Sequence, residues 1–141
     1  MSLHSRRLKL LTQCFTITQQ ELKIKIPGRF KVYYIKCENN AWFIGITTKS
    51  LESQLQDNLD NIDEKTVWTR INKPLSIHLQ NEFESKEEAK FEEQSLLFLF
   101  MLKYGINNVR GGKYWFPILN KVIYVSIQNE LTKLKKNTTI I

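Results

Sequence analysis

The sequence predicts a small α/β domain of the α+β kind, and three observations lead to this prediction. Two runs rich in aromatic and β-branched residues flank a polar turn at 38–40, which is the pattern of a β-hairpin. An alternating run at 75–79 is typical of a third strand, and helical patterns occupy 50–59 and 85–104. A chain of 141 residues is long enough to bury one core of this size.

The hairpin extends from Tyr33 to Gly45. Asn39 and Asn40 suit its turn, because Asn tolerates positive φ at modest cost. Adjacent strands are expected to bring Tyr33 near Phe43, while Gly45 leaves room above the second strand.

Residues 1–28 are predicted to form a basic extension before the main fold. It contains a short amphipathic helix over 3–15 and an alternating strand at 22–26, which ends at Pro27-Gly28. Residues 1–36 hold eight Lys or Arg and one acid, whereas the rest of the chain has 13 of each sign. Such an arm contacts nucleic-acid phosphates, acts as a solubilising tail or binds an acidic protein, and the sequence leaves all three open.

The first helix begins after Ser50, a suitable N-cap. Its apolar side chains recur one turn apart, at Leu51, Leu55 and Leu59. Gln54 and Asn58 are four residues apart and share an adjacent face. The polar residues 60–68 are predicted to form a loop.

The longest helix is predicted to begin at a capping box, Ser85 with Glu88, and to end at Tyr104. Gly105 fits the left-handed position after its last turn. Residues 96–102 are apolar all round, which predicts either a central core helix or a contact with another subunit.

Two segments complete the chain. Residues 106–112 are predicted to form a glycine-rich loop whose backbone can approach a phosphate closely. Residues 117–141 are predicted to form a C-terminal helical extension that packs on the domain, which leaves 29–116 as the domain itself.

Composition excludes several classes of protein. No apolar run reaches membrane-spanning length, and the first residues lack the apolar region of a secretory signal. Cys14 and Cys37 are too few for a disulfide framework or a zinc site. The protein is therefore predicted to have no membrane contact and to be intracellular, in the cytoplasm, nucleoid or an organelle.

Several motifs in this order resemble the GIY-YIG nuclease superfamily. Lys31-Val32-Tyr33 stands where that family has GIY, and Phe43-Ile44-Gly45 stands where it has YIG. Residues 104–112 are similar to a subgroup that carries an Asn-Val-Arg-Gly-Gly stretch. Trp68-Thr69 and Lys73-Pro74 also resemble that subgroup, and the ordered set is fairly specific although each motif alone is weak.

The resemblance covers most of the chain, residues 30–115. It implies a three-stranded antiparallel sheet flanked by helices. It also implies metal-dependent cleavage of a phosphodiester. In the family, two motif tyrosines position and deprotonate the attacking water, a helix Arg stabilises the phosphate, a Glu holds one divalent cation and an Asn supports the site.

Carried over residue by residue, the first half of the site is altered. Tyr33 keeps the first tyrosine, but Phe43 replaces the second and lacks its hydroxyl. Gln54 stands where the family has Arg, and Asn58 stands where many members have His.

The second half of the site comprises the metal ligand and the supporting Asn. Glu93 is the best match to the metal ligand, with Glu92 and Gln94 as alternatives. Asn108 matches the supporting Asn. The cofactor would be Mg²⁺ or Mn²⁺ if the protein is active, and none otherwise.

These residues predict a GIY-YIG-like nucleic-acid-binding protein with weakened or lost cleavage, and DNA is favoured over RNA as its partner. The alternatives are an active metal-dependent endonuclease with an altered site, and a structural subunit that contacts a protein partner or a second copy through 96–102. Basic residues expected to contact nucleic acid are Lys31, Lys36, Lys49, Arg110 and Lys113.

Overall fold

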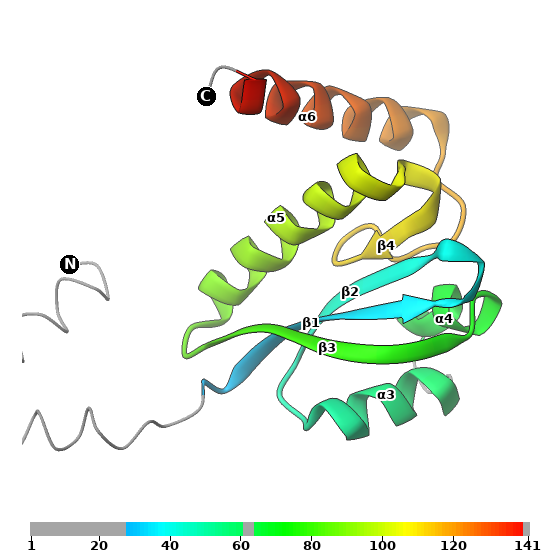
Figure 1. Cartoon of the computed structure of the whole chain (residues 1–141), viewed down its shortest axis with the longest axis vertical. Helices are drawn as coiled ribbons and strands as arrows, with labels where there is room; N and C mark the ends of the chain where they lie inside the picture. The colour runs from blue at the N-terminus through cyan, green and yellow to red at the C-terminus, as the bar shows by residue number, and fades with distance from the viewer. Residues whose placement is uncertain (1–27, 61–63, 140–141) are drawn as a thin grey trace, which may run out of the picture.

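A four-stranded mixed sheet forms the centre of the computed structural model, which describes residues 28–60 and 64–139 (Figure 1). The strand order is β3-β1-β2-β4. β1 (Phe30–Cys37) pairs antiparallel with both β2 (Trp42–Thr47) and β3 (Pro74–Phe83). These three strands were predicted, but the sheet is not purely antiparallel, because β4 (Val109–Gly111) pairs parallel to β2.

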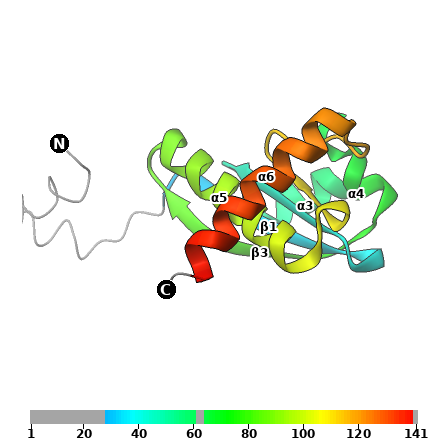
Figure 2. The ribbon, with the colours of Figure 1, turned by 90° about the horizontal axis from the view of Figure 1, so that it is seen from above.

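Helices cover both faces of the sheet (Figure 1). α3 (Leu51–Asp60) and α4 (Val67–Ile71) pack on the face that carries Tyr33 and Phe43. α5 (Lys86–Tyr104) packs on the opposite face, and α6 (Lys121–Thr139) crosses over α5 on the side away from the sheet (Figure 1 and Figure 2). The sheet therefore lies between two helical layers, with α6 outside α5.

The predicted hairpin is confirmed. Its turn is the short 3₁₀ helix η1 (Glu38–Asn40), in which Asn39 and Asn40 have positive φ. Tyr33 lies directly opposite Gly45, and its ring centroid is 6.5 Å from that of Phe43. A Cβ at Gly45 would lie 2.5 Å from the Tyr33 hydroxyl, so glycine is needed there to accommodate the ring.

Two segments that were predicted to be loops contain short elements. Residues 60–68 include the 3₁₀ helix η2 (Glu64–Thr66) and the start of α4, and 106–112 include η3 (Ile106–Asn108) and β4. These predictions were wrong because elements of three to five residues are too short to show a hydrophobic period. The predicted helix at 3–15 and strand at 22–26 lie outside the described residues.

α5 begins as predicted, since the Ser85 hydroxyl accepts a hydrogen bond from the Glu88 N–H at 3.3 Å. Gly105 ends it with φ 98° and ψ 145°, so its φ is positive but its ψ is extended rather than left-handed helical.

The apolar segment 96–102 is less buried than its composition predicted. Leu97 and Met101 lie in the core, but Leu99 is 50% exposed and Leu102 is 38% exposed. Ile127 from α6 joins the same core cluster. Over residues 28–60 and 64–139, none of the helices combines the length and the apolar character needed to cross a membrane.

Candidate functional site

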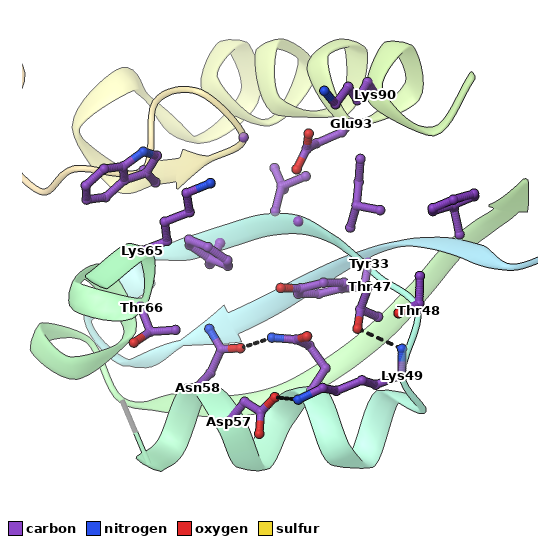
Figure 3. A pocket seen from close by; sticks show the side chains of 18 of the residues that line it. Tyr33, Thr47, Thr48, Lys49, Asp57, Asn58, Lys65, Thr66, Lys90 and Glu93 are labelled. Atoms are coloured by element: carbon purple, nitrogen blue, oxygen red, sulfur yellow. Dashed lines mark hydrogen bonds and ion pairs between the residues drawn. The ribbon is translucent and has the colours of Figure 1, made fainter. Parts of the chain in front are cut away.

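A groove opens at the part of β2 that β4 does not cover. β4 pairs only with Trp42, Phe43 and Ile44, and the chain then turns away after the Gly112 N–H donates to the Ile44 carbonyl at 3.3 Å. Beside residues 45–47, a cavity of about 940 Å³ lies between α3 and α5 (Figure 3). Residues from six separate segments of the chain line this groove, so the fold, rather than any one motif, creates it.

Tyr33 lies on the sheet at the centre of the groove (Figure 3). Only 3% of its surface is exposed. Burial is the main reason that its pKa is raised well above the ordinary value, and the negative charges of Glu93 and Asp57 raise it further. Its hydroxyl is therefore a neutral hydrogen-bonding group at neutral pH.

One side of the groove, the α3 wall, consists of Gln54, Asp57 and Asn58 together with Lys49, which precedes the helix (Figure 3). The Gln54 amide donates to the Asn58 side-chain oxygen at 2.7 Å, and the fully buried Asn58 donates to the Thr69 hydroxyl at 3.2 Å. Lys49 forms an ion pair with Asp57. The polar groups of this wall therefore satisfy one another.

The opposite side, the α5 wall, consists of Lys86, Lys90, Glu93 and Gln94. Desolvation raises the pKa of Glu93 to about 7, although the nearby charges of Lys65 and Lys90 act in the other direction. Within the part of the chain that the structure describes, Glu93 has no hydrogen-bond partner. A Cβ at Gly112 would lie 3.3 Å from the Glu93 carboxyl carbon, so the Gly111-Gly112 turn packs closely over this carboxyl.

The groove is strongly basic. Two carboxyl groups line it, those of Asp57 and Glu93. Five lysines line it from three directions: Lys49, Lys65, Lys86, Lys90 and Lys113. One carboxylate is paired with Lys49 and the other is partly protonated near pH 7, so the groove attracts anions.

The structure brings most of the predicted site residues together. The predicted residues that line the groove are Tyr33, Phe43, Lys49, Gln54, Asn58, Glu93 and Lys113. Of the three alternatives for a metal ligand, Glu93 and Gln94 face the groove and Glu92 does not line it.

Four predicted residues do not line the groove, and Arg110 is the fourth of them. Asn108 does not line the groove, and its side chain donates to the Tyr104 carbonyl at 2.7 Å, at the end of α5. Lys31 and Lys36 are on β1 outside the groove lining, and the Lys36 ammonium lies 6.0 Å from the Trp42 ring centroid.

Arg110, which was predicted to contact nucleic acid, is not among the residues that line the groove. Arg110 is 4% exposed, and its guanidinium donates to four backbone carbonyls, including Ile106 at 2.6 Å and Phe116 at 3.1 Å. It also lies 4.7 Å from the Trp68 ring centroid. Burial lowers the pKa of Arg110 to about 10, so its guanidinium is charged at neutral pH. Its N–H groups donate to backbone carbonyls of the chain itself.

Sequence reasoning missed several residues of the groove. Lys86 and Lys90 were missed although they share one face of α5 with the predicted Glu93, at spacings of four and three residues, and this spacing was a usable signal. Lys65 and Trp115 come from short segments without a period, and only the fold places them in the groove.

The lining of the groove offers a divalent cation few ligands. Among residues 28–60 and 64–139, no three His, Cys, Asp or Glu side chains converge as a metal-binding group. Glu93 is nevertheless a desolvated carboxyl that faces the groove, whereas Asp57 is paired with Lys49. Mg²⁺ commonly binds through one or two carboxylates plus substrate phosphates, so Glu93 supports a cation site that a phosphate completes.

Comparison with known proteins adds no relative to this picture. No family model matches the chain, and neither a curated protein nor a solved structure matches it. Function is therefore inferred from the groove's own residues.

Proposed function

We propose that the chain is a nucleic-acid-binding protein of the GIY-YIG endonuclease type, in which phosphodiester cleavage is weakened or lost. The observation that carries this proposal is a basic groove centred on Tyr33 and Glu93, two residues that also match the motifs of that family. DNA is the favoured partner, and the fold offers a surface along which a phosphate backbone can lie.

The lysines of the groove supply the affinity in this proposal. Each phosphate that a lysine neutralises releases condensed counterions, so affinity falls steeply with salt. Five lysines line the groove and Lys49 is already paired with Asp57, so about three or four phosphate contacts are expected, which gives a slope of roughly −3 to −4 in a plot of log affinity against log salt.

The residues at the centre of the groove support weak cleavage. Phe43 carries no hydroxyl that could orient or deprotonate water, and Gln54 carries no charge and is bonded to Asn58. Tyr33 is held in its neutral form and can donate a hydrogen bond but cannot act as a base at neutral pH. Loss of one charge-stabilising donor costs on the order of 10²–10³ in rate.

Glu93 is the residue that would hold Mg²⁺ or Mn²⁺ against a substrate phosphate. A bound cation would supply positive charge at the phosphate. The chain's own part is to position that phosphate. Lys90 and Lys65 lie close enough to Glu93 to lower its pKa, and they would contact the phosphate oxygens.

The binding proposal is tested by fluorescence anisotropy with labelled DNA and RNA over a series of salt concentrations. Exchanging Lys86 and Lys90 together for Gln should weaken binding about tenfold at low salt and reduce the salt slope by about 2. The matched control exchanges Lys121 and Lys135, two exposed lysines of α6, and removes the same charge. Equal losses of affinity in the two double variants, or an affinity that does not depend on salt, would refute binding of nucleic acid in this groove.

The cleavage proposal is tested by a nuclease assay with Mg²⁺ or Mn²⁺. The chain as it stands should cut weakly or not at all, and Phe43→Tyr combined with Gln54→Arg should increase cutting about 10²-fold or more. Adding Glu93→Gln to that double variant should remove the gain. Strong cutting by the unaltered chain would instead favour an active endonuclease with an altered site.

A second candidate function is a structural subunit that contacts another protein. The observation that favours it is the pair of exposed leucines on α5, Leu99 and Leu102, which are one turn apart. Sedimentation of the unaltered chain and of the Leu99→Ser, Leu102→Ser double variant tests for self-association through this face. A structural subunit should lose self-association in the double variant, while nucleic-acid binding is unchanged.

A further inference from the structure

Trp115 is the one tryptophan among the residues that line the groove. It is half-buried, and Lys113 and Lys65 line the same cavity. Its ring meets Phe116 in a T-shaped contact, with centroids 5.6 Å apart and planes at 75°. An edge contact of this kind covers at most one face of the indole. A flat apolar surface is thus combined with cations in the basic groove.

The backbone on both sides of Trp115 is held in place. On the preceding side, Tyr114 and Gly111 exchange two backbone hydrogen bonds of 2.8 and 3.0 Å. On the following side, Arg110 donates to the carbonyls of Phe116 and Pro117 at 3.1 and 3.0 Å. The backbone that carries Trp115 is therefore fixed, which reduces the entropy that a ligand must remove when it binds.

We propose that Trp115 stacks on an unpaired nucleobase, so that the groove prefers single-stranded or branched nucleic acid to a continuous duplex. Bases inside a duplex are covered on both faces by their neighbours, whereas an unpaired base exposes a face that can stack on an aromatic side chain. Lys113 and Lys65 would contact the phosphates beside that base. This inference rests on the proposed function and specifies its substrate class.

In this proposal Arg110 is a positioning residue for Trp115. Its guanidinium does not reach the ligand, because its donors are used on carbonyls and its side chain is buried. By fixing the carbonyls that follow Trp115, it keeps the indole over the groove.

The test compares two variants that both keep an apolar side chain, Trp115→Phe and Trp115→Leu. Affinity is measured by anisotropy for a labelled single strand and for a blunt hairpin duplex of the same sequence. The leucine variant should bind the single strand about tenfold more weakly with little change for the duplex, and the phenylalanine variant should retain most of the affinity. Stacking should also quench tryptophan fluorescence in the unaltered chain, and Trp115→Phe should lose that quenching.

Phe91→Leu provides the control, because Phe91 is 76% exposed on α5 and does not line the groove. It should leave both affinities unchanged. Equal losses for single strand and duplex in Trp115→Leu, or equal behaviour of the leucine and phenylalanine variants, would overturn base stacking while leaving the binding proposal intact. Failure of the binding proposal has a different signature, which is salt-insensitive or absent binding by the unaltered chain.

Discussion

The two walls of the groove use polar side chains in opposite ways. On the α3 wall, Gln54 bonds to Asn58, Asn58 bonds to Thr69, and Lys49 pairs with Asp57. On the α5 wall, the Glu93 carboxyl is desolvated and its pKa is raised to about 7. Interactions that are already satisfied stabilise the fold, whereas a desolvated charge destabilises it and is available to a ligand.

The comparison shows that residues at motif positions do not all have the same kind of role. The proposed resemblance assigns Asn58 and Gln54 to positions used for chemistry, yet in this structure they form a hydrogen-bonded support for α4 through Thr69. Glu93 retains the electrostatic character expected of a ligand-binding group. Three substitutions separate the structural role from the ligand-binding role.

Asn58→Ala should lower the free energy of unfolding by about 3 kcal/mol, because it removes a fully buried side chain that donates to the Thr69 hydroxyl and accepts from the Gln54 amide. Urea denaturation measures the change. Gln56→Ala is the control on the same helix, since Gln56 is exposed and its side chain donates to the exposed Asp60, and it should cost less than about 0.5 kcal/mol. Similar costs for the two variants would mean that the α3 wall is not a structural support.

Glu93→Gln should stabilise the protein in a pH-dependent manner. The pKa of Glu93 in the folded protein, about 7, lies above its ordinary value of 4.5, so the folded state binds more protons than the unfolded state between these pH values. Stability of the unaltered chain therefore falls as pH rises through this window. The glutamine variant should be roughly 2 kcal/mol more stable at about pH 8 and nearly unchanged at about pH 4.

Denaturation midpoints of the two proteins over this pH range provide the measurement. A difference in midpoint that does not change with pH would indicate that Glu93 does not titrate over this range. The α5 wall would then not differ from the α3 wall in the way described.

Asp57→Asn should strengthen nucleic-acid binding about fivefold, or about 1 kcal/mol, because it releases Lys49 from its ion pair. Asp60→Asn removes the same charge from the same helix, but Asp60 is exposed outside the groove lining, so it should have a smaller effect. The gain should also vanish in a Lys49→Gln background. A gain that survives there would show that Asp57 acts only by repelling phosphate.

Local sequence patterns predicted the elements with clear periods or turn chemistry. Two Asn residues marked the turn of the hairpin, Ser85 marked the start of α5, and the leucine stripe marked α3. β4 was missed because it has only three residues and pairs with a strand that is distant in the sequence. Parallel pairing of this kind leaves no local pattern.

The groove was harder to predict than the fold because its properties depend on burial and on partners. The sequence indicated that Arg110 carries a charge, but not that carbonyls of the following loop would use its donors. It likewise did not place Lys65 and Trp115 beside Tyr33, since these residues meet only after α4 and β4 have packed on the sheet. Motif matching found Tyr33 and Glu93, which are fixed by regular elements.

The brief pairing of β4 with β2 has a consequence for the order of folding. The β1–β2 hairpin closes a short loop, and β3 pairs with β1 across 37 to 53 residues, whereas β4 must return from beyond α5 to pair with residues 67 positions earlier in β2. Closing the longer loop costs more chain entropy and is expected to follow the local pairings. During synthesis, β1, β2 and β3 would therefore pair before the groove is complete. The chain would gain the capacity to hold a ligand only when β4 pairs with β2.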